Sequence, residues 1–409
     1  MTRRWYSWTH WPTLFAAAVL ALSSALLMAN FVVHAISHKH RIVILPQHLD
    51  GVTASTKPVF SLRAVLSGEY QTLFARDVGT HLPLYAGAVR LRNQIDYSLF
   101  DVAGTWFLTI GRHKQLIENA YIDEYCSRDV SQFLVGADAW AKKLRQMQDD
   151  TERRGKTFLY VLTPSKVAQY PEYLPKGYPC PSSEADRTTL VPTWLKILRH
   201  NGVHVADTIG VVSAAHGVYP FALWPRGGTH WNAVGSALAT RAVGEGLQAL
   251  RHDGVFAPFT FTWRMVSRPQ PPDNDLALLM NLIWPVDDYA VPAVSIAWGP
   301  ASCRKLNVTV VGGSFMIALA ELMGQGPCHP HFVEYEYWQI DRLIWPGGKI
   351  TKLPVDDAER ARDVMDADVL IYEENEQVLG HSQHGPALYN FLSQQPGWLP
   401  QETAKARAP

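Results

Sequence analysis

The chain contains little charge and little cysteine for its length, and each shortage excludes a class of protein. Of its 409 residues 18% are charged, and 37 basic residues balance 37 acidic ones, so no net charge attracts the chain to nucleic acid. The four cysteines are widely spaced and form no CxxC pair, which argues against a zinc site. No internal repeat occurs, and no long disordered stretch lies outside the termini. We therefore expect a folded protein with no metal, cofactor or nucleic-acid partner.

Apolar and aromatic residues are plentiful by contrast. Hydrophobic residues make up 47% of the chain, which includes fourteen Trp and sixteen Tyr. Such aromatic residues are compatible with carbohydrate-contacting surfaces, although core and interface packing explains most of them. The length allows two or three domains, or one large α/β domain with additions.

The N-terminal segment indicates whether the protein is inserted into a membrane or exported. No charged residue occurs between residues 11 and 33, a length that can cross a hydrocarbon core as a helix. Basic residues flank the segment on both sides, so the positive-inside rule is nearly balanced. The segment is either a membrane span or a signal peptide. Because its apolar part is long and no small-x-small cleavage site stands out, we expect an uncleaved signal anchor at 11–36, preceded by cytoplasmic residues 1–10 and followed by a linker at 37–60.

Cysteine number supports an exported body. An even number of cysteines in an oxidising compartment predicts two disulfides, with three possible connectivities. We favour Cys126–Cys180 and Cys303–Cys328, because the members of each pair are near in sequence. The second bond would brace the strand and helix around Ser314.

Strands and helices alternate along the chain. Buried strands are predicted at 157–162, 308–311 and 369–372, with further strands at 106–110, 203–207 and 331–335. Helices are predicted at 131–153, 190–200, 231–250, 316–323 and 356–363. This alternation predicts a largely parallel sheet flanked by helices, with sites outside the carboxyl ends of the strands.

The sequence VTVVGGSF at 308–315 reads as a strand, a tight turn and a helix start. Its two glycines permit the turn, and Ser314 then lies where free N–H groups of Gly313 and Ser314 could stabilise an oxyanion. The alternative is an ordinary turn in which Ser314 only caps the helix.

A second glycine turn, GGTHWN at 227–232, precedes a helix and holds His230. An imidazole on such a loop suits a general base, although histidines more often cap helices or lie on surfaces. Asp275 stands at another predicted helix start, either as a cap or as the acid that orients His230. The polar residues 373–376 after the last buried strand are expected to solvate a turn.

Five short stretches in this order resemble the SGNH-hydrolase-like domain of bacterial polysaccharide O-acetyltransferases of the alginate AlgJ and AlgX type. They are residues 110–126 (strand end, Tyr-Ile and Cys), LTPSK at 162–166 with YPE at 170–172, GTHW at 228–231, GGSF at 312–315 and EENE at 373–376. The resemblance covers about residues 61–392. It implies an α/β domain at 61–395, with a mainly parallel sheet and a disordered tail at 396–409.

The resemblance also implies function. Such proteins are anchored in the inner membrane with the catalytic domain in the periplasm. They move acetyl groups to hydroxyls of an exported polysaccharide, and a multispanning membrane O-acyltransferase typically delivers the acetyl donor. Ser314 corresponds to the nucleophile and His230 to the base, while Lys166, Trp231 and Asn232 are expected to bind substrate.

One departure from the family concerns the third catalytic residue. The family usually has an aspartate two residues before the histidine, where this chain has Gly228. Either Asp275 or Asp207 supplies the acid, or Ser314 and His230 act as a dyad. Two rival functions remain open: a periplasmic acetylesterase, and a non-catalytic glycan-binding or assembly subunit. The chain ends soon after the last sheet element, which favours the AlgJ-like layout of anchor plus catalytic domain.

Overall fold

The structure, a computed structural model, describes residues 11–37, 48–51, 59–81, 85–251, 256–300, 303–353 and 357–398. It forms two compact units, one of Met1–Trp106 with Leu276–Val286 and one of Phe107–Asp275 with Asp287–Pro409. The predicted cytoplasmic residues 1–10, most of the predicted linker and the tail beyond residue 398 lie outside the described residues. The domain boundaries stay predictions.

The smaller unit is helical. Its helices are α1 (Trp11–Ser37), α2 (Leu62–Leu66), α3 (Glu69–His81) and α4 (Tyr85–Phe100), and it includes most of α11 (Asp275–Leu279). Within the described residues, the one helix long and apolar enough to cross a membrane is α1, over Thr13–Val33. Its role as a signal anchor stays a prediction.

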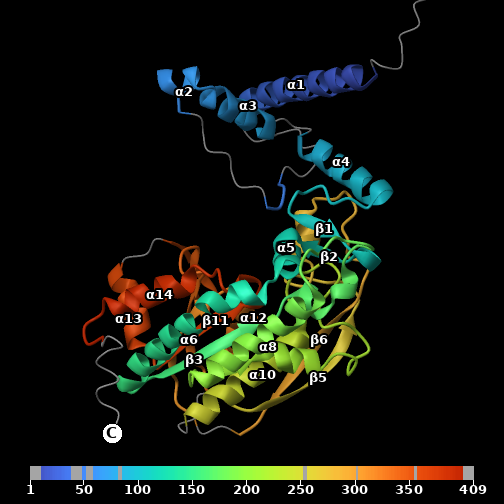
Figure 1. The fold of residues 1–409 in the computed structure, drawn as a ribbon. Helices are drawn as coiled ribbons and strands as arrows, with labels where there is room; N and C mark the ends of the chain where they lie inside the picture. The colour runs from blue at the N-terminus through green and yellow to red at the C-terminus, as the bar shows by residue number, and fades with distance from the viewer. Residues whose placement is uncertain are drawn as a thin grey trace, which may run out of the picture. The chain divides into compact units, whose positions relative to one another are not determined.

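The larger unit is built on a seven-stranded mixed sheet with the order β10-β9-β8-β7-β11-β3-β4 (Figure 1). Five neighbouring strands are parallel, and β9 and β10 add an antiparallel edge. The strands are β3 (Thr157–Thr163), β4 (Val205–Asp207), β7 (Asn307–Gly312), β8 (His331–Glu336), β9 (Asp341–Trp345), β10 (Lys349–Lys352) and β11 (Val369–Asn375). The predicted fold class, an α/β domain with a mainly parallel sheet, is confirmed.

Helices cover both faces of this sheet. One face packs against α10 (Ala233–Leu250) and α12 (Phe315–Gly324) through a core that includes Val310 and Ile371. The other face packs against α6 (Val130–Arg153), α8 (Glu184–His200) and α14 (His384–Ser393) through a core that includes Tyr160 and Tyr372. Because side chains alternate along a strand, neighbouring residues of β11 serve opposite faces.

Shorter elements complete the larger unit. They are the antiparallel pairs β1 (Leu108–Ile110) with β2 (Leu116–Glu118) and β5 (Phe259–Val266) with β6 (Val291–Trp298), the helices α5 (Asn119–Ser127), α7 (Lys166–Gln169), α9 (Thr208–Ala214) and α13 (Asp357–Asp366), and the 3₁₀ turns η2 (Arg112–Lys114), η3 (Pro171–Tyr173) and η4 (Glu376–Val378). The sequence analysis did not predict the β5–β6 pair or the β9–β10 edge.

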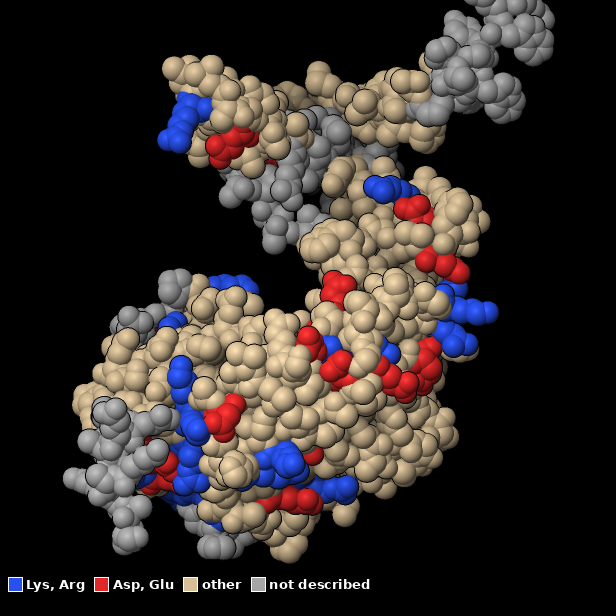
Figure 2. All heavy atoms as spheres, viewed as in Figure 1, with Lys and Arg blue, Asp and Glu red and all other residues tan. Residues whose placement is uncertain are grey.

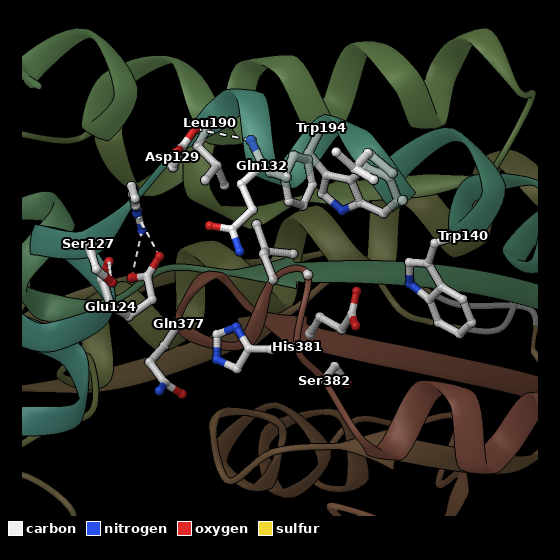
Figure 3. Close-up of a pocket in the computed structure, with 18 of the residues that line it drawn as sticks. Glu124, Ser127, Asp129, Gln132, Trp140, Leu190, Trp194, Gln377, His381 and Ser382 are labelled. Atoms are coloured by element: carbon white, nitrogen blue, oxygen red, sulfur yellow. Dashed lines mark hydrogen bonds and ion pairs between the residues drawn. The ribbon is translucent and has the colours of Figure 1, made fainter. Parts of the chain in front are cut away.

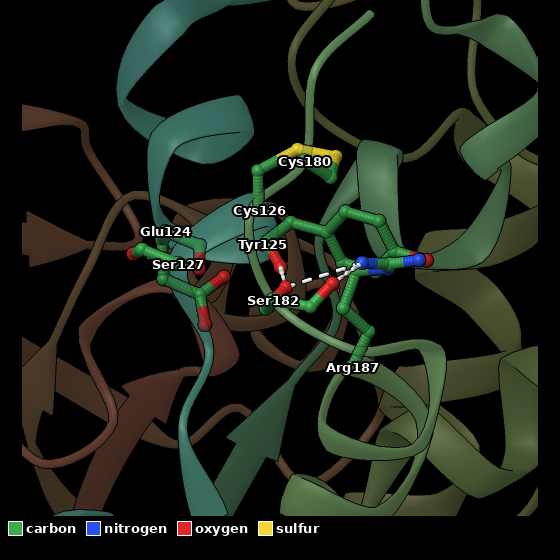
Figure 4. The surroundings of a disulfide bond; sticks show 7 residues. All are labelled: Glu124, Tyr125, Cys126, Ser127, Cys180, Ser182 and Arg187. Atoms are coloured by element: carbon green, nitrogen blue, oxygen red, sulfur yellow. Dashed lines mark hydrogen bonds between the residues drawn. A yellow bond between two sulfur atoms is a disulfide. The ribbon is translucent and has the colours of Figure 1, made fainter.

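Two disulfides form as predicted, Cys126–Cys180 and Cys303–Cys328. The first joins α5 to the segment that runs on to Ser182 and Arg187 (Figure 4), where the Ser182 N–H donates to the Cys126 carbonyl at 3.0 Å. The second closes a loop with a sequence separation of 25 residues that contains β7 and all of α12.

Replacing Cys303 and Cys328 together with serine is expected to lower the free energy of unfolding by about 3.5 kcal/mol, because the unfolded chain regains the entropy of a loop of this length. Chemical unfolding of the oxidised wild type and the double variant measures the difference. The double variant of Cys126 and Cys180, whose separation is 54 residues, should lose slightly more, about 4 kcal/mol. Equal stability of the wild type and both variants would contradict the expectation.

Surface charge on the larger unit is mixed. On the face that Figure 2 shows, Lys and Arg side chains are interspersed with Asp and Glu among a mostly uncharged surface. This distribution agrees with the balanced composition of the chain.

Candidate active site

Ser314 lies between the carboxyl end of β7 and the first turn of α12, and two glycines make that position possible. A Cβ atom added at Gly312 would lie 2.7 Å from Cβ of Glu373, and one added at Gly313 would lie 3.0 Å from the Tyr337 ring. Any larger residue would therefore collide with side chains beside Ser314. The Ser314 side chain makes no capping hydrogen bond to α12, so its hydroxyl is available for another partner.

The loop that carries His230 is held from several sides. Lys166 Nζ donates to the carbonyl oxygens of Pro225 and Gly228 at 2.8 and 3.0 Å. Asn232 caps α10 by accepting the N–H groups of the next turn. The His230 ring packs against Phe315, with centroids 4.9 Å apart. These contacts fix the imidazole next to the residue that follows Ser314.

Asp275 lies beside the same loop. Its Oδ1 accepts the Thr229 N–H at 2.9 Å, and its Oδ2 lies 2.7 Å from His230 Nδ1. A Cβ at Gly228 would lie 2.9 Å from the Pro272 carbonyl oxygen and 3.0 Å from that of Asp273. The segment that brings in Asp275 thus occupies the space that a side chain at position 228 would need.

Ser314, His230 and Asp275 form one hydrogen-bonded line. His230 Nε2 lies 2.8 Å from Ser314 Oγ, and Asp275 contacts the other ring nitrogen. An ionised carboxylate only accepts, so Nδ1 carries the proton and Nε2 has the lone pair that can accept the serine proton. The side chains of His230 and Asp275 are 17% and 25% exposed, so solvent reaches the line only in part. This arrangement can activate a serine as a nucleophile.

Tyr337, which the sequence analysis missed, lies against Ser314. Its N–H donates to the Gly312 carbonyl at 2.7 Å, which ties it to the end of β7. Burial raises the pKa of Tyr337 to about 12, although hydrogen bonds with the side chain and backbone N–H of Ser314 act in the opposite direction. The phenol is therefore protonated near neutral pH and can donate a hydrogen bond at the nucleophile.

Glu373 corrects the predicted oxyanion donors. The Gly313 N–H donates to Glu373 Oε2 at 2.6 Å, so this donor is already occupied. The Thr163 hydroxyl donates to the other oxygen of the same carboxyl group. Burial raises the pKa of Glu373, and these hydrogen bonds oppose the rise. The other predicted donor is the Ser314 N–H, which is hydrogen-bonded to the Tyr337 side chain.

The expectation that residues 373–376 only solvate a turn is wrong. All four side chains are buried, and Glu376 accepts the Ser165 N–H at 2.6 Å and Arg128 Nη2 at 2.9 Å. Residues 373–375 form the end of β11 itself, which other elements enclose, so these polar groups have partners within the chain.

The predicted substrate-binding residues are buried and have partners within the chain. Lys166 is 3% exposed, and four carbonyl oxygens surround its ammonium group. Trp231 is 2% exposed and packs edge-on against Phe315, while Asn232 is equally buried as a helix cap. These side chains support the loop that carries His230, and substrate binding by them stays a prediction.

Asp207 is not beside His230. It caps α9 by accepting the Gly210 N–H at 2.9 Å. Of the two acids considered from the sequence, Asp275 is the one that contacts the imidazole. Within the described residues, no group of three or more His, Cys, Asp or Glu is arranged to hold a metal ion.

Other carboxyl groups surround the line and were not predicted. Burial and the neighbouring charge of Asp275 raise the pKa of Asp273 to about 7. Burial also raises the pKa of Glu118, and a hydrogen bond with the Thr229 side chain opposes this rise. Asp273 could have been noticed from its position two residues before Asp275, whereas Glu118 gave no sequence signal.

The fold and this site define an α/β protein with a mainly parallel sheet and a serine at the carboxyl edge of that sheet. Residues 130–297 match a family model described as ALGX: SGNH hydrolase-like domain, acetyltransferase AlgX. The match confirms the resemblance drawn from the sequence. The matched segment contains His230 and Asp275, and Ser314 lies beyond its end.

Solved structures give similar folds at low identity. The O-acetyltransferase domain of Pseudomonas putida AlgJ is 17% identical, with a TM-score of 0.45, over 69% of this chain and 98% of that one. Pseudomonas aeruginosa AlgX is 14% identical, with a TM-score of 0.43, over 72% and 67%. Bacillus cereus PatB1 with a sulfonyl adduct is 9% identical, with a TM-score of 0.42, over 66% and 94%. Comparison with curated protein sequences gives no match.

Proposed function

We propose that the protein is a serine-dependent O-acetyltransferase that moves acetyl groups onto hydroxyls of an exported polysaccharide. The observation that carries the proposal is the line Asp275–His230–Ser314, with distances of 2.7 and 2.8 Å. The family model matched by residues 130–297, which is that of an acetyltransferase domain, supports the same chemistry.

The first half-reaction acetylates the serine. His230 Nε2 takes the proton from Ser314 Oγ as that oxygen bonds to the carbonyl carbon of an acetyl donor. When the donor's bond to the acetyl group breaks, His230 returns the proton to the leaving group. Ser314 is then an acetyl ester, and Asp275 has stabilised the transient imidazolium.

The second half-reaction transfers the acetyl group. A sugar hydroxyl gives its proton to His230 Nε2 and attacks the acetyl-serine carbonyl carbon, and Ser314 leaves with the proton. Both tetrahedral intermediates carry a negative oxygen. The Tyr337 hydroxyl is the donor placed to stabilise it, since the N–H groups of Gly313 and Ser314 are already bound to Glu373 and Tyr337. Acetyl passes from one ester to another, so no further reactant is consumed.

The setting follows from the N-terminal helix. We propose that α1 anchors the chain in the inner membrane with residues 61–395 in the periplasm, where the two disulfides would form. A multispanning membrane O-acyltransferase would supply the acetyl donor on that side.

Transfer and hydrolysis separate when the full chain is given an activated acetyl ester with and without oligosaccharide acceptors. We expect acetyl esters to appear on the acceptor, measured by mass spectrometry, and free acetate to fall as acceptor is added. Acetate release that ignores every acceptor would instead identify an esterase. An ester probe that leaves Ser314 unlabelled while glycan still binds would identify a non-catalytic binding subunit.

A further inference from the structure

A cavity of about 900 Å³ lies on the face of the sheet covered by α6, α8 and α14. Its walls come from α5, α6, α8 and the loop that follows β11. Figure 3 shows Gln377, His381 and Ser382 along one side and Gln132, Leu190 and Trp194 along the other, with Trp140 at one end. The mechanism proposed for Ser314 uses none of these side chains.

An unexplained glycine lines this cavity. Gly136 lies inside the 24-residue helix α6, where glycine is among the least favourable residues. A Cβ added there would meet no atom within 4 Å, so close packing does not require glycine. Trp140 stands one turn later on the same helix face and also lines the cavity. The missing side chain leaves space beside an aromatic ring, which is what a stacked ligand needs.

Glu374 lines the cavity, and two hydrogen bonds fix the orientation of its carboxylate. Glu374 is 1% exposed, and its two oxygens accept the Tyr160 hydroxyl at 2.7 Å and the Tyr372 hydroxyl at 2.6 Å. A carboxylate has about four acceptor positions, so roughly two remain for a ligand that donates hydrogen bonds. Because the two phenols fix its orientation, Glu374 is preorganised to accept hydroxyl groups.

The charged side chains that line the cavity favour a neutral ligand over an acidic one. The residues that line the cavity include one arginine, and Arg128 is already paired with Glu124 at 2.7 Å and with Glu376 at 2.9 Å. Besides Glu124, which is part of that pair, the charged side chains in the lining are the carboxylates of Asp123, Asp129 and Glu374. An acidic cavity repels polymers of uronic acids and accepts a neutral ligand rich in hydroxyl groups.

We propose that this cavity is a second glycan site, which binds a neutral sugar unit stacked on Trp140 with its hydroxyl groups donating to Glu374. The site is distinct from Ser314, because Glu374 and Glu373 are consecutive in β11 and point to opposite faces of the sheet. The proposal does not depend on the reactivity of Ser314. Binding at this cavity would keep a neutral polysaccharide attached to the protein whether or not an ester is being formed at Ser314.

A hydrogen-bonded path joins the two sites. Ser382 lines the cavity and lies 3.0 Å from His384 Nδ1, while His384 Nε2 lies 2.9 Å from the Glu373 carbonyl oxygen. A carbonyl only accepts, so His384 Nε2 carries the proton and Nδ1 accepts from the serine. Glu373 in turn binds the N–H of Gly313. The loop that lines the cavity is thus tied by hydrogen bonds to the turn that holds Ser314.

The test fills the cavity from Gly136. In the full chain, Gly136→Trp should place an indole in the empty space, and Gly136→Ala, which leaves the space open, is the matched control. Isothermal titration calorimetry compares a soluble cello-oligosaccharide with an oligomannuronate of the same length. We expect the wild type and Gly136→Ala to bind the neutral oligosaccharide, and Gly136→Trp to lose one binding site or at least about ten-fold in affinity.

A second variant tests the carboxylate, and a separate readout tests the fold. Glu374→Gln keeps the size of the side chain and should weaken the same binding. Reaction of Ser314 with a small ester probe should be unchanged in both Gly136 variants, which shows that they are folded and that the first site is intact. Undiminished binding by Gly136→Trp, equal or tighter binding of the oligomannuronate, or no binding of the neutral oligosaccharide by the wild type would each overturn the proposal.

Discussion

Replacing Ser314 with alanine is expected to reduce acetyl transfer by about six orders of magnitude, the scale seen when a serine nucleophile is removed from a comparable triad. The hydroxyl is the atom that would carry the acetyl group. It caps no helix, so its removal leaves α12 unchanged. His230→Ala should cost a similar factor, since without the imidazole no group near Oγ can accept its proton.

Two readouts distinguish chemistry from folding in these variants. Rates with an activated acetyl ester report the first half-reaction, and mass spectrometry of the intact protein reports the acetyl-serine. Ser213→Ala is a suitable control, because the Ser213 hydroxyl binds Gln169 on an exposed surface at 2.9 Å. Wild-type rates in Ser314→Ala or His230→Ala would contradict the assigned roles.

Asp275→Asn is expected to lower the rate of acetyl transfer by about four orders of magnitude. The amide can still accept the Thr229 N–H through its oxygen, so the loop should keep its position. Its NH₂ group would face His230 Nδ1, however, and would force the imidazole proton onto Nε2. That nitrogen could then no longer accept the proton of Ser314.

The matched control for this prediction is Asp207→Asn. Asp207 is the other acid considered from the sequence, and asparagine caps a helix as well as aspartate does. Its activity and stability should match the wild type. Nitrogen NMR of His230 should show the changed tautomer in Asp275→Asn alone. Full activity of Asp275→Asn, or an equal loss in Asp207→Asn, would show that another group orients the base.

Local sequence signals predicted much of the sheet and two members of the site. The strands β3 and β7 and the first four residues of β11 are short apolar runs rich in β-branched and aromatic residues, which identify buried strands. Ser314 and His230 each follow paired glycines at a helix start, a pattern readable within eight residues. Such features depend on neighbours in sequence and so can be predicted from one chain.

Features that depend on distant segments could not be predicted in the same way. The occupied Gly313 N–H reflects a carboxylate 60 residues away in sequence, and the Tyr337 contact depends on how the chain leaves β8. Lys166 follows a strand end, where a functional role is a reasonable expectation, yet its four carbonyl partners come from two other segments. The β9–β10 edge carries charged residues that mask a strand pattern.

The Cys303–Cys328 bond bears on when the segment around Ser314 reaches its final covalent structure. It makes β7, Ser314 and all of α12 part of one covalent ring. Thiols stay reduced in the cytoplasm and pair only in an oxidising compartment, so in the proposed periplasmic setting the ring would close after export. Newly made copies that are still in the cytoplasm would lack this brace. Under the proposed function, maturation of the turn that carries Ser314 would thereby be coupled to arrival in the compartment where acetyl transfer takes place.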